Sequence, residues 1–354
     1  MPLHRVSNVR LKDIAEKLNV SVSTVSRALG KDTSNLVAPE LRKKIHDLAE
    51  QANYIPHPAA QLMRKPRTHL ITVLLPLETG AFMSEYYGAV LSGVVSASRE
   101  LETETRVALI DHNATDVLDQ MQRVAIGAGG LLYMAMALNT EELSRLQNFG
   151  RPVVVMSGSL PPHVELSAIN VNTVGVDNVT GGYEITRILL KLGHQRIGLI
   201  NGPATARAAC DREAGFRKAL KEHGVACDER AIIHTEFTHP AGAKAWPQIQ
   251  QASPRPTALV CGNDEIAFGV LEALAKDGID CPGEISIVGF DDSRWAARVR
   301  PALTTARQPM TQLGVAATEL LVRLLQATDQ MRPEHVVFPM EIMQRQSVAP
   351  PAKA

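Results

Sequence analysis

The sequence predicts a small all-α head joined to a larger α/β body built from two lobes. Helical periodicity fills the head, whereas strand-like apolar runs alternate with helical segments from Leu70 onward. The first 67 residues carry 12 Lys and Arg against 6 Asp and Glu, and the rest carry 25 against 31. The net charge of zero therefore hides a basic head and an acidic body. Such asymmetry is typical of a module that binds a polyanion.

Three helices are predicted in the head. Apolar residues at helical spacing predict the first over residues 11–18. Asn19 can adopt the left-handed conformation that ends a helix, and Ser21 is suited to cap a second helix over residues 22–29. A third helix is expected to begin at Pro39. Two short helices joined by a tight turn predict a helix-turn-helix.

The second helix of this motif is predicted to bind DNA. Its outward side chains are short or hydroxylated except for one arginine, which suits a helix that enters a major groove about 12 Å wide. Arg27 can donate two hydrogen bonds to a guanine. The alternative is an ordinary solvated helix, but the basic segment around it favours DNA. The outward positions are Val22, Ser23, Thr24, Ser26 and Arg27.

The head resembles the LacI/GalR family of bacterial transcription regulators in the segments LKDIAEKLNVSVSTVSRAL, VAPELRKKI and NYIPHPAAQLMRK. The resemblance implies a DNA-binding headpiece over residues 1–56 and a hinge helix with its linker over residues 57–67. It makes Val22 and Ser23 the main sequence readers. The DNA contacts that it implies are Leu11, Ser21, Val22, Ser23, Thr24, Ser26, Arg27, Ala60 and Met63.

The hinge segment departs from the family's usual Ala-Arg-Ser-Leu. Here the four residues are Ala60, Gln61, Leu62 and Met63, so a methionine takes the place of the leucine that wedges into the minor groove. Methionine is apolar and flexible and can still unstack a base step. The alternative is that Leu62 and Met63 only pack the two hinge helices of a dimer together.

The body is predicted to contain parallel sheets in two lobes that face a shared cleft. Alternation of strands and helices favours parallel sheets, and open α/β sheets bind ligands beyond the ends of their strands. Strands are predicted at 70–76, 105–111, 130–135, 152–158, 196–202, 231–236, 258–264 and 286–291, and helical segments at 84–101, 177–192, 210–223, 264–277 and 310–326.

Several classes of protein are disfavoured. The sequence has no motif for nucleotide phosphates, serine hydrolysis or zinc proteolysis, so we expect no cofactor, no metal and no catalytic residues. The four cysteines are widely spaced, which predicts reduced thiols rather than disulfides. No apolar run reaches the length of a membrane span and the N-terminus lacks a signal-peptide core, so we expect a cytoplasmic protein.

Polar residues at predicted strand ends indicate small-molecule binding. Asn263 and Asp264 close one strand, Asp291 and Asp292 close another, and Arg212 begins a helix. Carboxylate, amide and guanidinium groups offer the paired donors and acceptors that a polyhydroxylated or anionic molecule needs. The alternative is that Asp264 and Asp292 cap the helices that follow them.

The resemblance to the LacI/GalR family extends over the body, in segments such as VDNVTGG, GNDEIAFGVLEAL and LTTARQP. It implies that residues 68–354 form a two-lobed, periplasmic-binding-protein-like domain for effector binding and dimerisation. Phe237 would lie flat against a sugar ring. The effector contacts that it implies are Phe82, Met83, Ser157, Arg212, Phe237, Asn263, Asp291 and Gln308.

Two departures in the body bear on the effector. Ser157 stands where the family often has an aspartate, and Ala206 and Ala208 stand where purine-binding relatives need polar side chains, which disfavours a purine. Arg207, between those alanines, either faces solvent or turns inward toward an anionic ligand.

Together these patterns predict a ligand-responsive, sequence-specific repressor of carbohydrate or related metabolite genes, with repression implied by the family. The expected partners are pseudo-palindromic operator DNA, a second copy of the chain, and a sugar, sugar acid or sugar phosphate. No membrane partner is expected. The alternative is a cytoplasmic sugar-binding protein or enzyme in which the head has no DNA role.

Overall fold

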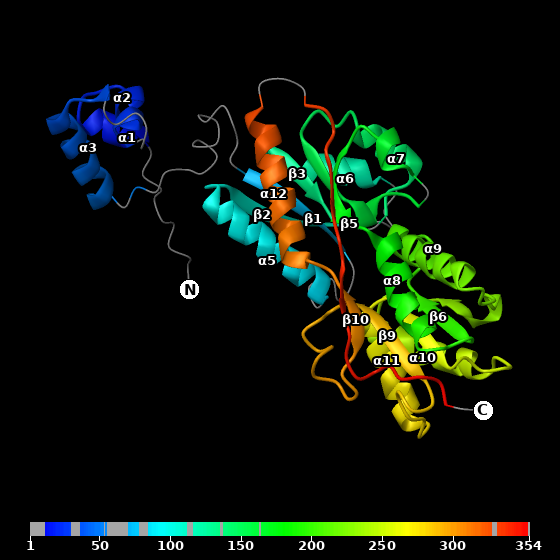
Figure 1. Cartoon of the computed structure of the whole chain (residues 1–354). Coiled ribbons are helices and arrows are strands. Elements are labelled where there is room, and N and C mark those ends of the chain that lie inside the picture. Colours follow the sequence, from blue (N-terminus) through cyan, green and yellow to red (C-terminus); the bar gives the residue numbers. More distant parts are fainter. Residues whose placement is uncertain are drawn as a thin grey trace. The chain divides into compact units, whose positions relative to one another are not determined.

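A computed structural model describes residues 11–29, 36–52, 54, 70–77, 84–111, 116–134, 137–162, 164–327 and 331–352. The chain divides into two compact units, Met1–Pro66 and Arg67–Ala354, which are described separately below and in Figure 1. The predicted hinge and linker, residues 57–67, lie outside the described residues, so the finer division of the chain remains a prediction.

The head consists of the three predicted helices α1 (Leu11–Lys17), α2 (Val22–Ala28) and α3 (Pro39–Gln51). Asn19 has a φ of 50°, the left-handed conformation expected where the first helix ends. All three helices contribute to one apolar core because each presents a stripe of aliphatic side chains to the other two. Its buried members are Ile14, Ala15, Val25, Ala28, Val37, Ile45 and Ala49.

The body contains two six-stranded sheets, one in each lobe. The first has the order β11-β5-β4-β3-β1-β2 and the second the order β12-β10-β9-β8-β6-β7. All neighbours are parallel except β10 and β12. The strands are β1 (Leu70–Pro76), β2 (Glu104–Ile110), β3 (Gly130–Tyr133), β4 (Val153–Met156), β5 (Asn172–Val176), β6 (Ile197–Asn201), β7 (Ile232–His234), β8 (Ala258–Cys261), β9 (Ser286–Asp291), β10 (Thr304–Arg307), β11 (His335–Phe338) and β12 (Glu341–Met343).

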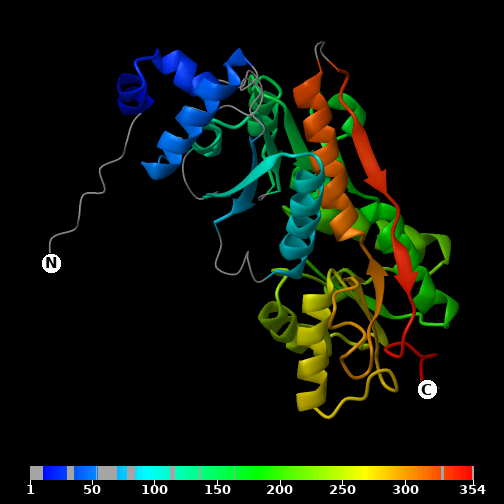
Figure 2. The ribbon, with the colours of Figure 1, turned by 90° about the vertical axis from the view of Figure 1, so that its left-hand side faces the viewer.

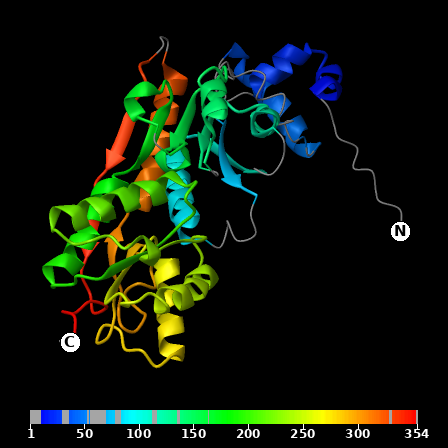
Figure 3. The same ribbon diagram turned by 90° about the vertical axis from the view of Figure 1, so that its right-hand side faces the viewer.

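Helices cover both faces of each sheet, so each lobe has three layers (Figures 2 and 3). In the first lobe α5 (Glu85–Glu100) and α12 (Met310–Gln326) cover one face, and α6 (Val117–Val124) and α7 (Thr140–Leu146) cover the other. In the second lobe the pairs are α8 (Asn178–Lys191) with α9 (Arg207–Glu222), and α10 (His239–Gln250) with α11 (Asp264–Lys276). Short 3-10 turns lie at Ser157–Ser159 (η3), Leu166–Ala168 (η4) and Glu229–Ala231 (η5).

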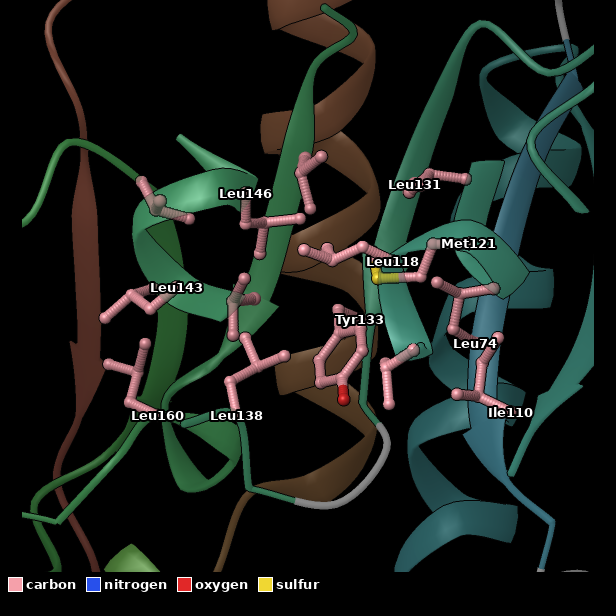
Figure 4. Close-up of a cluster of buried hydrophobic side chains, with 14 of the residues drawn as sticks. Leu74, Ile110, Leu118, Met121, Leu131, Tyr133, Leu138, Leu143, Leu146 and Leu160 are labelled. Atoms are coloured by element: carbon pink, nitrogen blue, oxygen red, sulfur yellow. The ribbon is translucent and has the colours of Figure 1, made fainter. Parts of the chain in front are cut away.

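Apolar side chains alternate between the two cores of the first lobe. Ile71 and Val73 of β1 join the core beneath α5 and α12, while Leu74 joins the core beneath α6 and α7. In Figure 4, Leu118 of α6 and Leu143 of α7 converge on this second core around Tyr133. Strands that are buried on both faces read as nearly continuous apolar runs, and the sequence shows this pattern at β3, at β4 and, apart from Thr72, at β1.

The chain passes between the lobes at three places: after β5, after β10, and between β11 and β12. The last of these crossings appears in Figure 1 as the red segment that runs along both lobes. Because every connection between the lobes is a short segment outside the sheets, the contacts across the cleft decide how the lobes are arranged.

Three helix pairs pack so closely that each helix contributes a glycine to the contact. A Cβ added at any of these glycines would lie within 2.0 to 2.3 Å of a backbone oxygen of the neighbouring helix. The glycines are Gly93 with Gly314 (α5 and α12), Gly182 with Gly215 (α8 and α9), and Gly242 with Gly269 (α10 and α11).

Replacing Gly314 by alanine is expected to destabilise the body by about 1 to 3 kcal/mol, because the new methyl group must push α5 away from α12. Gly88 is the matched control, since it lies on α5 with open space around its Cα. Alanine at Gly88 should leave the free energy of unfolding unchanged or raise it by about 0.5 to 1 kcal/mol. Urea unfolding of both variants measures the difference, and equal effects of the two substitutions would contradict the close-packing explanation.

Candidate DNA-binding helix and effector cleft

The N-terminal end of α2 presents three hydroxyl groups together. The Oγ of Ser21 accepts a hydrogen bond from the amide of Thr24 at 3.0 Å, which caps the helix as predicted. The same oxygen lies 3.0 Å from the Oγ of Ser23 and 2.8 Å from the Oγ1 of Thr24. Val22 beside them is 43% exposed. A short, polar helix end of this kind fits the floor of a major groove.

One residue of the predicted DNA surface is buried instead. Ser26 is only 6% exposed, so its prediction as an outward position is wrong. It follows Val25, and α2 packs against both α1 and α3, which leaves a narrower outer face than a solvated helix would have. Arg27 and Ser23 are exposed, as predicted. Leu11 packs partly against the head's core, and its DNA contact remains a prediction.

Four predicted site residues lie outside the described residues: Ala60 and Met63 of the hinge, and Phe82 and Met83 of the first lobe.

The second lobe brings Arg212 close to four other predicted effector residues, Phe237, Asn263, Asp291 and Gln308. The Nε of Arg212 donates to the Oδ1 of Asn178 at 2.9 Å, and its Nη1 donates to the carbonyl of Gly262. The guanidinium lies 4.5 Å from the ring centroid of Phe290 and 5.8 Å from that of Phe237. It is 6% exposed, and burial lowers the pKa of Arg212 while nearby Asp291 raises it.

Asp291 and Gln308 form a pair at the ends of adjacent strands. The Nε2 of Gln308 donates to the Oδ1 of Asp291 at 2.5 Å. Burial raises the pKa of Asp291 to about 6, while the charge of Arg212 and the bond from Gln308 pull it down. Asp291 also has a φ of 110°. This is an unfavourable conformation that costs about 1 to 3 kcal/mol and is found mostly at functional sites.

Asn263 and Phe237 are joined by a hydrogen bond. The Nδ2 of Asn263 donates to the carbonyl of Phe237 at 3.2 Å, and its Oδ1 accepts from the amide of Ile266 at 2.9 Å. Asn263 therefore caps α11 and also fixes the segment that carries the aromatic ring. A Cβ at Gly202 would lie 2.0 Å from that ring, so Gly202 allows the ring to approach the backbone.

The alternative that Asp264 and Asp292 cap helices is wrong for both. Asp264 accepts from the hydroxyl of Thr305 at 2.6 Å and from the amide of Ser293 at 2.7 Å. Burial raises the pKa of this carboxyl well above its usual value. Asp292 is paired with Arg307 at 2.7 Å and with Arg345 at 2.5 Å. Both carboxylates tie the loop after β9 to neighbouring strands, because these partners lie on other elements.

The first lobe contributes Ser157 and two residues that the sequence did not indicate. Ser157 begins η3 and packs against β5, where a Cβ at Gly175 would meet its Oγ. Tyr86 of α5 has its pKa raised to about 12 by burial and by the charge of Asp291. Glu85 beside it accepts a hydrogen bond from the amide of Arg294 at 2.7 Å. An aromatic residue in a mostly apolar helix gives no separate signal in a sequence.

A cavity of about 480 Å³ lies where the lobes meet. Asp291 and Gln308 line it from the second lobe, and Glu85, Ala89 and Met310 line it from the first. Arg212, Phe237 and Asn263 do not line it. A cavity of this size can hold a mono- or disaccharide, since small-molecule sites typically have volumes of about 300 to 1,000 Å³.

Within the described parts of the chain, no group of three or more His, Cys, Asp or Glu is arranged to hold a metal ion. The four cysteines are free thiols, of which Cys261 is buried. None of the described helices combines the length and the hydropathy that a membrane crossing requires.

Replacing Asp291 by asparagine is expected to stabilise the ligand-free protein at alkaline pH. The pKa of Asp291 is about 6 in the folded chain, against about 3.9 in an unfolded chain. The protonated carboxyl of Asp291 therefore makes its whole contribution to the free energy of unfolding below about pH 4. This contribution is lost as the pH rises through about 6. Asparagine does not ionise, so the variant should gain about 1 to 3 kcal/mol at pH 8 and less at pH 5. Urea unfolding at both pH values measures this, and a gain independent of pH would contradict it.

A helix-turn-helix head on a two-lobed α/β body with a polar cleft defines a DNA-binding regulator that carries a small-molecule-binding domain. Residues 10–57 match the family described as "Bacterial regulatory proteins, lacI family", and residues 186–348 match the "Periplasmic binding protein-like domain". The HTH-type transcriptional repressor PurR of Escherichia coli O1:K1 is 31% identical over 348 residues, which cover 96% of each chain. PurR of Klebsiella pneumoniae is 32% identical over 320 residues, 88% of this chain and 89% of that one.

The chain belongs to the lacI family of bacterial regulatory proteins, and it is a regulator of transcription rather than an enzyme. Solved structures agree on the fold. The transcriptional regulator CelR in complex with cellobiose is 25% identical with a TM-score of 0.72, and the match covers 96% of this chain and 100% of CelR. The Lac repressor dimer bound to operator is 22% identical with a TM-score of 0.82, and covers 97% and 100%.

Proposed function

We propose that the protein is a repressor that binds operator DNA through α2 and binds a neutral sugar in the cleft between its lobes. The carrying observation is the hydrogen-bonded pair of Asp291 and Gln308, which lines the cavity between the lobes. Membership of the lacI family argues against the alternative in which the head has no DNA role.

The chemistry of the cleft favours a polyhydroxylated ligand. Asp291 offers acceptor oxygens, Gln308 offers an amide, and Ala89 and Met310 offer apolar surface. Sugars combine hydroxyl groups on their edges with less polar ring faces, so a sugar site pairs polar side chains with apolar ones. Two solved relatives, each 25% identical, are complexes with cellobiose and with ribose.

Charge distinguishes a neutral sugar from a sugar acid or a sugar phosphate. Arg207, the cation nearest in sequence to the purine-contact positions, is paired with Asp211 at 3.3 Å. Arg307 and Arg345 are paired with Asp292. The cavity also has Glu85 and Asp291 in its lining. An anionic ligand would meet carboxylates here, and its charge would have to compete with existing ion pairs.

The remaining parts of the proposal follow from the family. The protein acts as a homodimer on a pseudo-palindromic operator, with the hinge placing Ala60 and Met63 at the minor groove. It works in the cytoplasm, where the DNA lies, and represses carbohydrate or related metabolite genes. The effector shifts DNA affinity only by as much as it prefers one arrangement of the lobes over the other.

Thermal unfolding with a ligand panel tests the effector proposal. Neutral mono- and disaccharides, sugar acids and sugar phosphates are added separately at millimolar concentration to the intact protein. A ligand that binds only the folded state raises the melting temperature, by mass action. We expect a rise with at least one neutral sugar. A rise confined to phosphates or acids, or to purines, would overturn the proposal of a neutral sugar.

A further inference from the structure

Few side chains cross the cleft between the lobes. In the ranges that the structure describes, side-chain hydrogen bonds join the lobes at Arg207 and at Glu85. Glu85 accepts from the backbone amide of Arg294, and its Oε2 also lies 3.8 Å from the Nε of the same arginine. Arg207 and Arg294 thus each make an arginine contact between the lobes, and Arg207 is the one of the two whose side chain binds backbone carbonyls of the opposite lobe.

Arg207 reaches from α9 in the second lobe to a loop of the first. Its Nη1 donates to the carbonyl of Val164 at 2.6 Å and to that of Pro161 at 3.3 Å. Its Nε lies 3.3 Å from the Oδ2 of Asp211, one helical turn further along α9. The side chain is only 15% exposed. The guanidinium thus spans three acceptors, which uses the fork geometry that lysine lacks.

The position of this arginine opposes the local preference of the helix. Arg207 is the first residue of α9, and the N-cap Ala206 makes no side-chain hydrogen bond. The positive end of the helix dipole disfavours a cation there, by about 0.3 to 1 kcal/mol. A residue that breaks a local rule is expected to be offset by tertiary contacts or by function. Here the hydrogen bonds to the opposite lobe and the ion pair with Asp211 compensate for the unfavourable interaction of the Arg207 charge with the helix dipole.

The two segments that Arg207 joins carry predicted effector contacts from both lobes. The first-lobe loop follows η3, which begins at Ser157, and α9 carries Arg212. α9 and η3 are in contact in the structure. A bond between these segments therefore fixes the spacing between the two sides of the cleft.

We propose that Arg207 is a positioning residue that holds the two lobes together on the α9 side of the cleft and thereby sets the lobe arrangement to which operator binding responds. The proposal rests on the proposed function for its DNA readout. Asp211 orients the guanidinium, and the two carbonyls of the first lobe are its partners. The contacts of Arg207 involve no ligand, so this link between the lobes, called the tether below, also forms in the ligand-free protein.

Hydrogen exchange of the intact protein tests the tether directly. In Arg207→Ala we expect amides in residues 157–169, such as those of Leu160 and Ile169, to exchange at least threefold faster than in the wild type. Alanine at the first position of α9 removes an unfavourable cation, so the helix itself should not fray more. Faster exchange in the opposite lobe therefore reports the lost contact.

Arg217→Ala is the matched control, because Arg217 lies on the same helix and binds Glu213 and Glu229 of its own lobe. It should leave the exchange of residues 157–169 unchanged. Arg207→Lys keeps the charge and loses the fork, so its exchange should fall between wild type and Arg207→Ala.

Operator affinity of the same ligand-free variants supplies the functional readout. We expect the Kd of Arg207→Ala to differ from the wild-type value by threefold or more, and that of Arg217→Ala to be unchanged. Unaltered exchange in Arg207→Ala overturns the tether. Altered exchange with an unaltered Kd overturns its coupling to DNA. Failure of the wild type to bind DNA would instead refute the proposed function, while the exchange result would still decide the tether.

Discussion

Replacing Arg212 by methionine should weaken effector binding by about 100-fold and leave operator binding intact. Methionine keeps much of the side chain's volume but removes donors to Asn178 and Gly262. It also removes the cation that lowers the pKa of Asp291, which should then rise further. Hydrogen bonds that involve a charged group contribute about 1.5 to 3 kcal/mol each, and a loss of about 2.7 kcal/mol corresponds to the stated factor. Calorimetry with the sugar selected by the thermal panel measures it.

Two further variants make this result interpretable. Arg217→Met removes an arginine from the same helix, whose partners Glu213 and Glu229 do not line the cavity, and should keep full effector affinity. Gln308→Ala removes one hydrogen bond to Asp291 and should cost about 10-fold. If Arg212→Met does not fold, Gln308→Ala still tests the site. Wild-type effector affinity in both cleft variants would place the effector elsewhere.

Changing Val22 and Ser23 together should change which operator is bound. These residues lie exposed at the start of α2 beside the Ser21 cap. Each base contact is worth about 1 to 3 kcal/mol, so affinity for the wild-type operator should fall by about 10- to 1,000-fold. Affinity for random DNA should hardly change, because phosphate contacts supply it.

Selection from a randomised duplex library measures this change of specificity. Gln51, which is exposed at the end of α3, provides the control, and Gln51→Ala should select the wild-type sequence. Selection of the wild-type sequence by the Val22 and Ser23 variant would show that α2 does not read the bases.

Sequence patterns predicted the strands that carry a clear apolar run, including the largely exposed β2 and the half-buried β7, and missed β5, β10, β11 and β12. The runs at β3 and β4 are apolar and that at β1 is interrupted only by Thr72, whereas β5 contains Asn172 and Gly175, and β10 reads Thr-Thr-Ala-Arg. The edge strands β11 and β12 are only partly buried. Among helices, α6 and α7 are too short for clear periodicity, and α10 contains Pro247. Tertiary pairing, rather than local preference, defines these elements.

The site was predictable where strand ends carry unusual polar residues. Asn263, Asp291 and Gln308 come together because parallel strands end at one edge of the sheet, and Arg212 approaches from α9. Which carboxylates are held by other side chains was not predictable, since it depends on partners remote in sequence. Asp264 is held by Thr305 in this way. The interlobe role of Arg207 also depends on a loop more than forty residues away.

The burial of Ser26 shows the limit of helical periodicity in a short helix. Seven residues make two turns, and α2 must pack against α1 on one side and α3 on the other. His46 of α3 also contacts the carbonyl of Ala28 at 3.1 Å. A helix held on two sides keeps a narrow outer face, which the sequence alone does not define.

The salt dependence of operator binding tests the central claim most directly. A labelled duplex from the protein's own promoter region is titrated with the intact protein between 50 and 200 mM salt, and binding is followed by fluorescence anisotropy. A basic head that neutralises several phosphates should lose roughly 10³-fold or more in affinity over this range, with a steep negative log-log slope. A slope near zero, or no binding at 50 mM salt, would contradict the assignment of the head to operator DNA.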